Sequence, residues 1–236
     1  MTALEFKGVV KDYRGLRPLR VADLSIVVHE RVALAGLDVP AAEVFINLAT
    51  GAGVPDQGQV RVMGEPTTAI TEADAWLTSL DTFGIVSHRA VLLDAMTVAQ
   101  NIAMSFSLSI EPIPSGTRAQ VDALAAATDI TPEELERQAG AVSGAARMRV
   151  HLARALALEP KVLVLEHPTI SVERSDVRTL AASIVRATSD RAIAVLALTD
   201  DEALAKGLGG RRLKLNAATG GTENWGRVSF FRFLKK

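Results

Sequence analysis

The sequence predicts an α/β fold with a mostly parallel central sheet, an N-terminal antiparallel β part and an inserted helical subdomain. Three observations support this fold class. Short apolar strands alternate with helical patterns along most of the chain. Two strand-like stretches stand together near the N-terminus, and several helical segments follow one another without a strand over residues 97–140. We expect residues 1–236 to form one domain, with the helical subdomain at about 89–150 and a C-terminal segment at 216–236.

In the first half of the chain, apolar runs bounded by glycine and proline mark the strands, and longer periodic stretches mark the helices. The buried run RVALA stops at Gly36, and the helix after it ends at Gly51, a common helix stop. The predicted elements are strands at 4–13, 22–29 and 31–35, a helix at 41–50, a strand at 59–63, a helix at 71–81, a strand at 84–87 and a helix at 97–109.

In the second half, capping residues define the helix starts. Thr97 caps the amphipathic helix at 97–109, Pro132 stands in a first turn, and Ser143 is a good N-cap. Residues 162–165 (VLVL) form an unbroken apolar run, as expected for a parallel strand covered on both faces. The remaining predictions are helices at 117–128, 132–138 and from 143, a helix at 173–187, a strand at 192–198, a helix at 201–206 and a strand at 211–215.

Composition excludes several classes of function. The 236 residues carry a net charge of −1, which gives no electrostatic case for binding nucleic acid. The absence of cysteine excludes disulfides and thiolate metal sites, and the four histidines lack ligand spacing, so we expect no metal site made by this chain alone. No apolar run is long enough to span a membrane, and no signal peptide is visible. We therefore expect an intracellular chain.

The stretch from Ser143 to Thr169 carries the most specific pattern. It reads SG-x-x-R-x-R-V-x-L-A-R-A-L, then E-P-K-V-L-V-L, then Glu166-His167-Pro168-Thr169. This order resembles the nucleotide-binding subunit of an ABC transporter, in which a signature turn and helix lead into the Walker B strand. The resemblance implies a P-loop-NTPase-like (RecA-like) sheet. In that family the strand ends Asp-Glu-Pro-Thr, so Glu166 keeps a carboxylate and His167 replaces one.

A P-loop is expected where the strand ending at Gly36 meets the next helix. Such a loop needs glycines, a lysine on the phosphates and a hydroxyl on magnesium. Here Ala42 stands at the lysine position and Glu43 at the hydroxyl position, while Val39 and Pro40 disfavour the loop conformation. An ordinary strand-to-helix turn is the alternative. We expect no ATP, or weakly bound ATP, in this site.

The family's remaining catalytic positions differ as well. His88 stands where a glutamine reaches magnesium, and Asp200 stands where a histidine contacts the γ-phosphate. The resemblance therefore implies degenerate positions at Ala42, Glu43, His88, Glu166, His167 and Asp200. A structural role is favoured for His167 over that of a general base, and a packed or interface role is favoured for His88. Tyr13 fits the adenine-stacking aromatic of the family, and a core or surface role is an equal alternative.

From the resemblance we expect a pseudo-ATPase subunit that pairs with a competent ABC ATPase subunit on membrane permease subunits. Ser143 and Gly144 would then face ATP and Mg²⁺ in the partner's site. His88, Arg89 and Met96 are the expected permease contacts, and the chain would lie at the cytoplasmic face of the membrane. The alternatives are a non-transport interaction scaffold and a weak residual homodimeric ATPase. Neighbouring genes and a hydrolysis assay would distinguish them.

The C-terminal segment is too apolar for a solvated tail. Trp225, Val228, Phe230, Phe231 and Phe233 fall within residues 222–236. We expect this segment to pack against protein.

Overall fold

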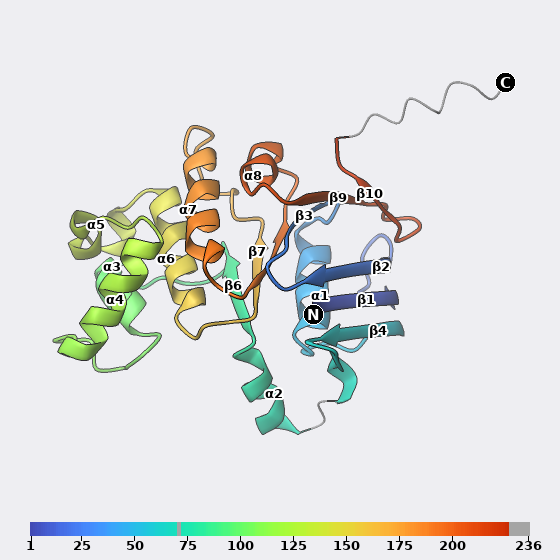
Figure 1. The fold of residues 1–236 in the computed structure, drawn as a ribbon, viewed down its shortest axis with the longest axis horizontal. Coiled ribbons are helices and arrows are strands. Elements are labelled where there is room, and N and C mark those ends of the chain that lie inside the picture. Colours follow the sequence, from blue (N-terminus) through green and yellow to red (C-terminus); the bar gives the residue numbers. More distant parts are fainter. Residues whose placement is uncertain (70–71, 227–236) are drawn as a thin grey trace.

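A computed structural model describes residues 1–69 and 72–226 (Figure 1). It contains two sheets, one antiparallel and one mainly parallel, so the predicted mixed α/β class is confirmed. The predicted packing of the last residues concerns 227–236, which lie outside the described part. Trp225, which belongs to the described part, donates its backbone N–H to the carbonyl of Arg212 at 2.9 Å.

The antiparallel sheet comes from the N-terminal part of the chain. Its strand order is β2-β1-β4-β5. The strands are β1 (Thr2–Lys11), β2 (Leu19–Val27), β4 (Gln57–Val62) and β5 (Glu65–Pro66). Buried and more exposed side chains are interspersed along β1 and β2, as expected for a sheet with one face on a core, although register shifts in β1 interrupt a strict alternation.

The second sheet has the order β10-β9-β3-β8-β7-β6 and is parallel except at the β10 edge. Its strands are β3 (Arg31–Ala35), β6 (Phe83–Ser87), β7 (Val162–Glu166), β8 (Ala194–Leu198), β9 (Arg211–Leu215) and β10 (Thr222–Asn224). Every residue of β7 and β8 is buried, which confirms the interpretation of the VLVL run. The edge strand β10 was not predicted, because it is short and polar.

Two apolar cores lie on opposite faces of the parallel sheet. Leu163 and Leu165 of β7 face the core shared with the helices after residue 97, whereas Val162 and Val164 face the core shared with the antiparallel sheet. This division follows from the two-residue period of a strand. In the second core, helix α1 (Val39–Ala49) packs Phe45 against Phe6 with ring centroids 4.2 Å apart. This contact packs α1 against β1 of the antiparallel sheet.

Four of the other helices form one group. Helices α3 to α6 lie together on one side of the parallel sheet, next to α7 (Figure 1). The helices other than α1 are α2 (Ala73–Leu80), α3 (Val98–Ala103), α4 (Ser115–Ala127), α5 (Pro132–Glu136), α6 (Gly144–Leu156), α7 (Val177–Ser189) and α8 (Glu202–Gly207), with 3₁₀ turns η1 (Thr67–Ala69) and η2 (Ala139–Ala141).

Several predicted helices differ in extent from the observed ones; the helix predicted at 173–187, for example, begins at Val177, and two other differences have a local cause. The helix predicted at 97–109 is capped by Thr97 as expected, but α3 ends at Ala103. Serines at 105, 107 and 109 compete for backbone hydrogen bonds, and the Ser107 hydroxyl accepts from the N–H of Ser109. The helix predicted from residue 41 begins earlier, at Val39, because Asp38 acts as its N-cap.

His151 lies on α6 with only 5% of its surface exposed. Burial, and secondly the positive charges of Arg154 and Arg147, together lower the pKa of its imidazole from 6.5 to about 4. Because the unfolded chain binds the proton more readily, stability is complete above pH 6.5 and is lost as the pH falls toward 4. We expect this group to contribute a loss of up to about 3 kcal/mol.

Chemical denaturation of the wild type and of His151→Gln between pH 7 and 4 would measure this loss. The difference in unfolding free energy between the two proteins should shrink or reverse as the pH falls. His29→Asn is a suitable control, because His29 is exposed and its positive φ of 67° suits asparagine. A His151→Gln curve parallel to the wild type would contradict the prediction.

Candidate functional site

The carboxyl ends of β3, β6, β7 and β8 meet along one edge of the parallel sheet. Strand register aligns Ser87 with Glu166 and Glu166 with Leu198, so the residues that follow these strands are neighbours. Asp200, just beyond β8, accepts a hydrogen bond from the N–H of Gly36, just beyond β3, at 2.9 Å. In open α/β sheets, ligands bind at this edge. The edge brings together the degenerate positions predicted from sequence.

The turn between β3 and α1 depends on Gly36. Its φ is +91°, and a Cβ there would lie 2.6 Å from the carbonyl oxygen of Leu215. Asp38 then caps the helix by accepting from the N–H of Ala41 at 2.9 Å, and its carbonyl accepts from the N–H of Ala42 at 2.8 Å. The chain therefore turns into a helix at once, without an open glycine loop.

This turn is unfavourable for an anion. A helix N-terminus binds phosphate through free backbone N–H groups. Here the carboxylates of Asp200 and Asp38 occupy the N–H groups of Gly36 and Ala41, and Pro40 has none. The side chain of Ala42, at the lysine position, is fully buried. A phosphate approaching the turn would meet two carboxylates in place of amide donors and an ammonium group.

An arginine connects two acidic residues beside the turn. The Nη1 of Arg89 lies 2.9 Å from Oε1 of Glu43, in the first turns of α1. Its Nε and Nη2 donate to Oε2 of Glu166, at the end of β7, at 3.2 and 2.9 Å. Glu166 Oε1 also lies 2.9 Å from Nη2, but without the alignment of a hydrogen bond. Three separate elements are thus joined through one guanidinium.

The electrostatics of this cluster favour a permanently charged arginine. Burial lowers the pKa of Arg89, but the hydrogen bonds and charges of Glu166 and Glu43 outweigh it, so the net pKa is raised. The Glu166 side chain is 0% exposed, whereas Arg89 and Glu43 both reach solvent. A fully buried carboxylate is tolerated when it is paired and hydrogen-bonded, and Arg89 supplies that pairing.

Sequence reasoning missed this role of Arg89. The permease contact predicted for Arg89 stays a prediction, and in addition its guanidinium faces the acidic residues at the sheet edge. Part of the signal was present in the sequence, whereas the pairing of β6 with β7 came from the structure. Glu166 ends a strand that is buried on both faces, so it requires a cation, and Arg89 follows a neighbouring strand by two residues.

His88 and His167 each stand one residue beyond the paired Ser87 and Glu166, at the same edge of the sheet. Nδ1 of His88 and Nε2 of His167 are buried, and neither has a hydrogen-bond partner among the described residues. The backbone of His167 has φ of +41°, and its N–H donates to the carbonyl of Leu198 at 2.9 Å. In the described part of the chain, no three His, Cys, Asp or Glu residues are arranged to hold a metal.

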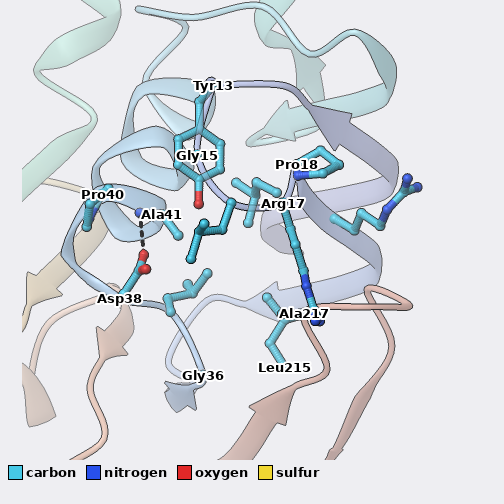
Figure 2. Close-up of a pocket in the computed structure, with 14 residues that line it drawn as sticks. Tyr13, Gly15, Arg17, Pro18, Gly36, Asp38, Pro40, Ala41, Leu215 and Ala217 are labelled. Carbon is cyan, nitrogen blue, oxygen red and sulfur yellow. Dashed lines mark hydrogen bonds between the residues drawn. The ribbon is translucent and has the colours of Figure 1, made fainter.

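Tyr13 lies at a pocket of about 560 Å³ between the residue 13–20 segment and the turn at 36–41 (Figure 2). The far wall includes Leu215 and Ala217. Burial, and secondly the negative charge of Asp38, raises the pKa of the Tyr13 phenol. The volume suits a small organic ligand. Tyr13 therefore lies beside the turn at 36–41, although at least 23 positions of sequence separate them.

The N-terminus of α6 is formed as predicted. The exposed Ser143 is its N-cap and accepts from the N–H of Ala146 at 3.2 Å. Gly144 packs so closely on the loop after β7 that an added Cβ would lie 1.8 Å from the carbonyl oxygen of Ser171. The signature turn and that loop therefore form one tightly packed unit.

The segment 88–96 leads from the sheet edge to α3. Met96, the third expected permease contact, is half-buried, and its carbonyl accepts from the N–H of Ala139 at 2.9 Å. Val91, which was not singled out from the sequence, is 72% exposed. No helix in the described residues is long and apolar enough to cross a membrane.

Comparisons with known proteins identify relatives. The ABC transporter family profile matches residues 21–170. The sulfate/thiosulfate import ATP-binding protein CysA of Thermosynechococcus vestitus is 29% identical over 202 residues, covering 84% of this chain and 57% of that protein. The lipoprotein-releasing system ATP-binding protein LolD of Pseudomonas fluorescens is 27% identical over 188 residues, covering 79% of this chain and 82% of that protein. The chain thus spans little more than half the length of CysA.

Solved structures share the fold. The dimeric structure of the bacterial ABC transporter cassette MJ0796 superposes with a TM-score of 0.74 at 19% identity, covering 94% of this chain and 98% of that one. A nucleotide-free ATP-binding cassette from an ABC transporter gives the same TM-score at 16% identity, covering 95% and 92%.

Proposed function

Because this chain belongs to the ABC transporter family as an ATP-binding domain, we propose that it is a pseudo-ATPase subunit of a transporter. In this role it pairs with a competent ABC ATPase subunit on membrane permease subunits. Its own site holds no Mg-ATP, or holds it weakly. Its signature turn completes the ATP site of the partner.

The Glu43–Arg89–Glu166 cluster is the observation that carries this proposal. Mg²⁺ needs an octahedron of oxygen ligands and gives up its water reluctantly. The carboxylate of Glu166 is already neutralised by Arg89, and Glu43 is bound to the same guanidinium. The residues present in this site therefore do not fit a magnesium nucleotide, and no hydrolytic step is assigned to them.

The turn at Gly36–Glu43 adds to the same conclusion. A hydrogen bond to a charged group contributes roughly 1.5–3 kcal/mol, so the missing lysine alone costs roughly 10- to 100-fold in affinity. Asp38 and Asp200 occupy backbone donors that an anion would use. These effects act on one ligand and in one direction. Tyr13 remains available for an aromatic base, but the phosphate contacts are absent from the turn.

The signature turn keeps Ser143 and Gly144, and Ala145 and Ala146, which follow them, add neither charge nor great bulk. Ser143 is exposed, and α6 begins at Gly144 with its N-terminus next to the loop after β7. A helix N-terminus suits a phosphate. We place ATP and Mg²⁺ in the partner's site, facing Ser143 and Gly144. The permease contacts lie along the segment that includes His88, Arg89 and Met96, which would hold the chain at the cytoplasmic face of the membrane.

Calorimetry with Mg-ATP and a sensitive hydrolysis assay on the purified chain test this proposal. We expect no hydrolysis above background and no micromolar affinity. Ala42→Lys should not restore either, because Asp38, Pro40 and Arg89 are unchanged and the new side chain must leave a fully buried position.

Other outcomes would support the alternative functions. Measurable turnover by the purified chain would support a residual homodimeric ATPase. Failure of the native chain to co-purify with a permease and a second ATPase subunit would support a non-transport scaffold. Micromolar Mg-ATP affinity would contradict the pseudo-ATPase assignment directly.

A further inference from the structure

Glu166 is a fully buried carboxylate whose cation partner, within the described residues, is Arg89. An ionised carboxylate without a partner is very costly in such a place. The same guanidinium also reaches Glu43 on α1. Arg89 therefore lies between two acidic side chains that approach it from different elements, and its positive charge stands where a divalent cation would be the alternative partner.

The segment that follows Arg89 is fixed at successive points. Nη1 of Arg154 donates to the carbonyl of Val91 at 2.9 Å. The buried Asn101 accepts from the N–H of Leu93 at 2.8 Å and donates to its carbonyl at 3.1 Å. Asp94 pairs with Arg147 at 2.7 Å. These later contacts tie the segment to the helices α3 and α6. Among the hydrogen bonds and ion pairs of the described residues, those of Arg89 alone tie its beginning to α1 and to Glu166 on β7.

The same segment presents apolar side chains to solvent. Val91 is 72% exposed and Leu93 is 39% exposed. A surface held in one conformation before binding costs less entropy on association. The Arg89 contacts thus determine whether this surface is pre-formed where the segment leaves β6.

We propose that Arg89 is a positioning residue that acts as a built-in cation: it takes the place of a divalent ion between Glu43 and Glu166 and fixes the segment 88–96 independently of any nucleotide. The inference rests on the proposed function in one respect: the proposed function identifies the segment 88–96 as the surface that contacts the permease. In this chain the docking surface is permanently formed, and no bound ligand is needed to order it.

Removing the guanidinium is a direct test, because it leaves two carboxylates facing each other with no cation between them. Such a pair attracts a divalent cation. We expect the wild type to show no specific Mn²⁺ site by electron paramagnetic resonance titration. Arg89→Ala should show one specific Mn²⁺ site, with an affinity about 10-fold or more above the non-specific Mn²⁺ binding of the wild type. Adding Glu43→Gln to that variant should remove the gain.

Hydrogen exchange of the full chain supplies a second readout. Amides of residues 88–91 should exchange faster in Arg89→Ala, return toward the wild-type rate when Mn²⁺ is added, and stay slow in Arg89→Lys, which keeps the charge. If Arg89→Ala does not fold, Glu43→Gln provides the test, because Glu43 is half-exposed. It should speed exchange at 88–91 without changing exchange at 93–96.

Two results would overturn the proposal: unchanged Mn²⁺ affinity in Arg89→Ala, or unchanged exchange at 88–91 in both Arg89→Ala and Glu43→Gln. Neither measurement involves ATP. The proposed pseudo-ATPase role can therefore fail in calorimetry while the role of Arg89 stands, and the reverse also holds.

Discussion

Replacing Gly144 with alanine should destabilise the chain by about 3 kcal/mol or more, a larger effect than most single substitutions have. The added Cβ would lie 1.8 Å from the carbonyl oxygen of Ser171 and 2.9 Å from its carbonyl carbon. These are backbone atoms, so no side-chain rotation relieves the contact. Either α6 or the loop after β7 must move, and the signature turn moves with them.

Gly116→Ala is a matched control. Gly116 also lies in the first turn of a helix, α4, but a Cβ there would have no heavy atom within 4 Å. Alanine should leave stability unchanged or raise it by about 0.5–1 kcal/mol. Denaturant titration of the two variants measures the contrast. Equal stability of Gly144→Ala and the wild type would show that the loop after β7 adapts without cost.

Ser143→Arg should reduce the ATPase rate of the assembled transporter by about 100-fold or more. If Ser143 faces the partner's nucleotide, the long arginine displaces that nucleotide from its reactive position, and a misplacement of about 1 Å already costs about 100-fold. The exposure of Ser143 allows the substitution without core disruption, although the lost N-cap costs about 1 kcal/mol. Turnover by the purified complex, with subunit content checked by gel filtration, is the measurement.

Ser143→Ala and His167→Gln are the controls for this result. Ser143→Ala loses the same cap without adding bulk, so it separates blockage from destabilisation. His167→Gln alters this chain's own site and should leave turnover nearly unchanged. The Nε2 of His167 has no hydrogen-bond partner among the described residues, so no contact of that atom is lost. If Ser143→Arg left the turnover of the complex unchanged and His167→Gln abolished it, the assignment of the two sites would be reversed.

Local sequence patterns predicted most of the secondary structure because hydrophobic period and capping act over a few residues. The buried VLVL run, the Thr97 and Ser143 caps and the glycine after β3 were all found where they were expected. The start of α1 at Val39 was missed because the capping strength of Asp38 was not considered. The end of α3 was missed because helical periodicity continued into serine-rich sequence that does not sustain a helix.

The sequence also determined which chemical groups stand at the sheet edge. Strand ends in a parallel sheet meet on one side, so the residues after β3, β6, β7 and β8 had to become neighbours once those strands were assigned. The family resemblance placed Ala42, Glu43, His88, Glu166, His167 and Asp200 there. What each residue does to its neighbours does not follow from that list.

Only the tertiary structure decided how these groups are paired. Arg89 and Glu166 are 77 residues apart in sequence, and Gly36 and Asp200 are 164 apart. Whether a carboxylate faces a ligand, a helix amide or a guanidinium depends on side-chain direction and burial, which no local pattern encodes. Burial of Glu166 makes a pairing cation necessary, and the register of β6 beside β7 makes Arg89 the residue that supplies it.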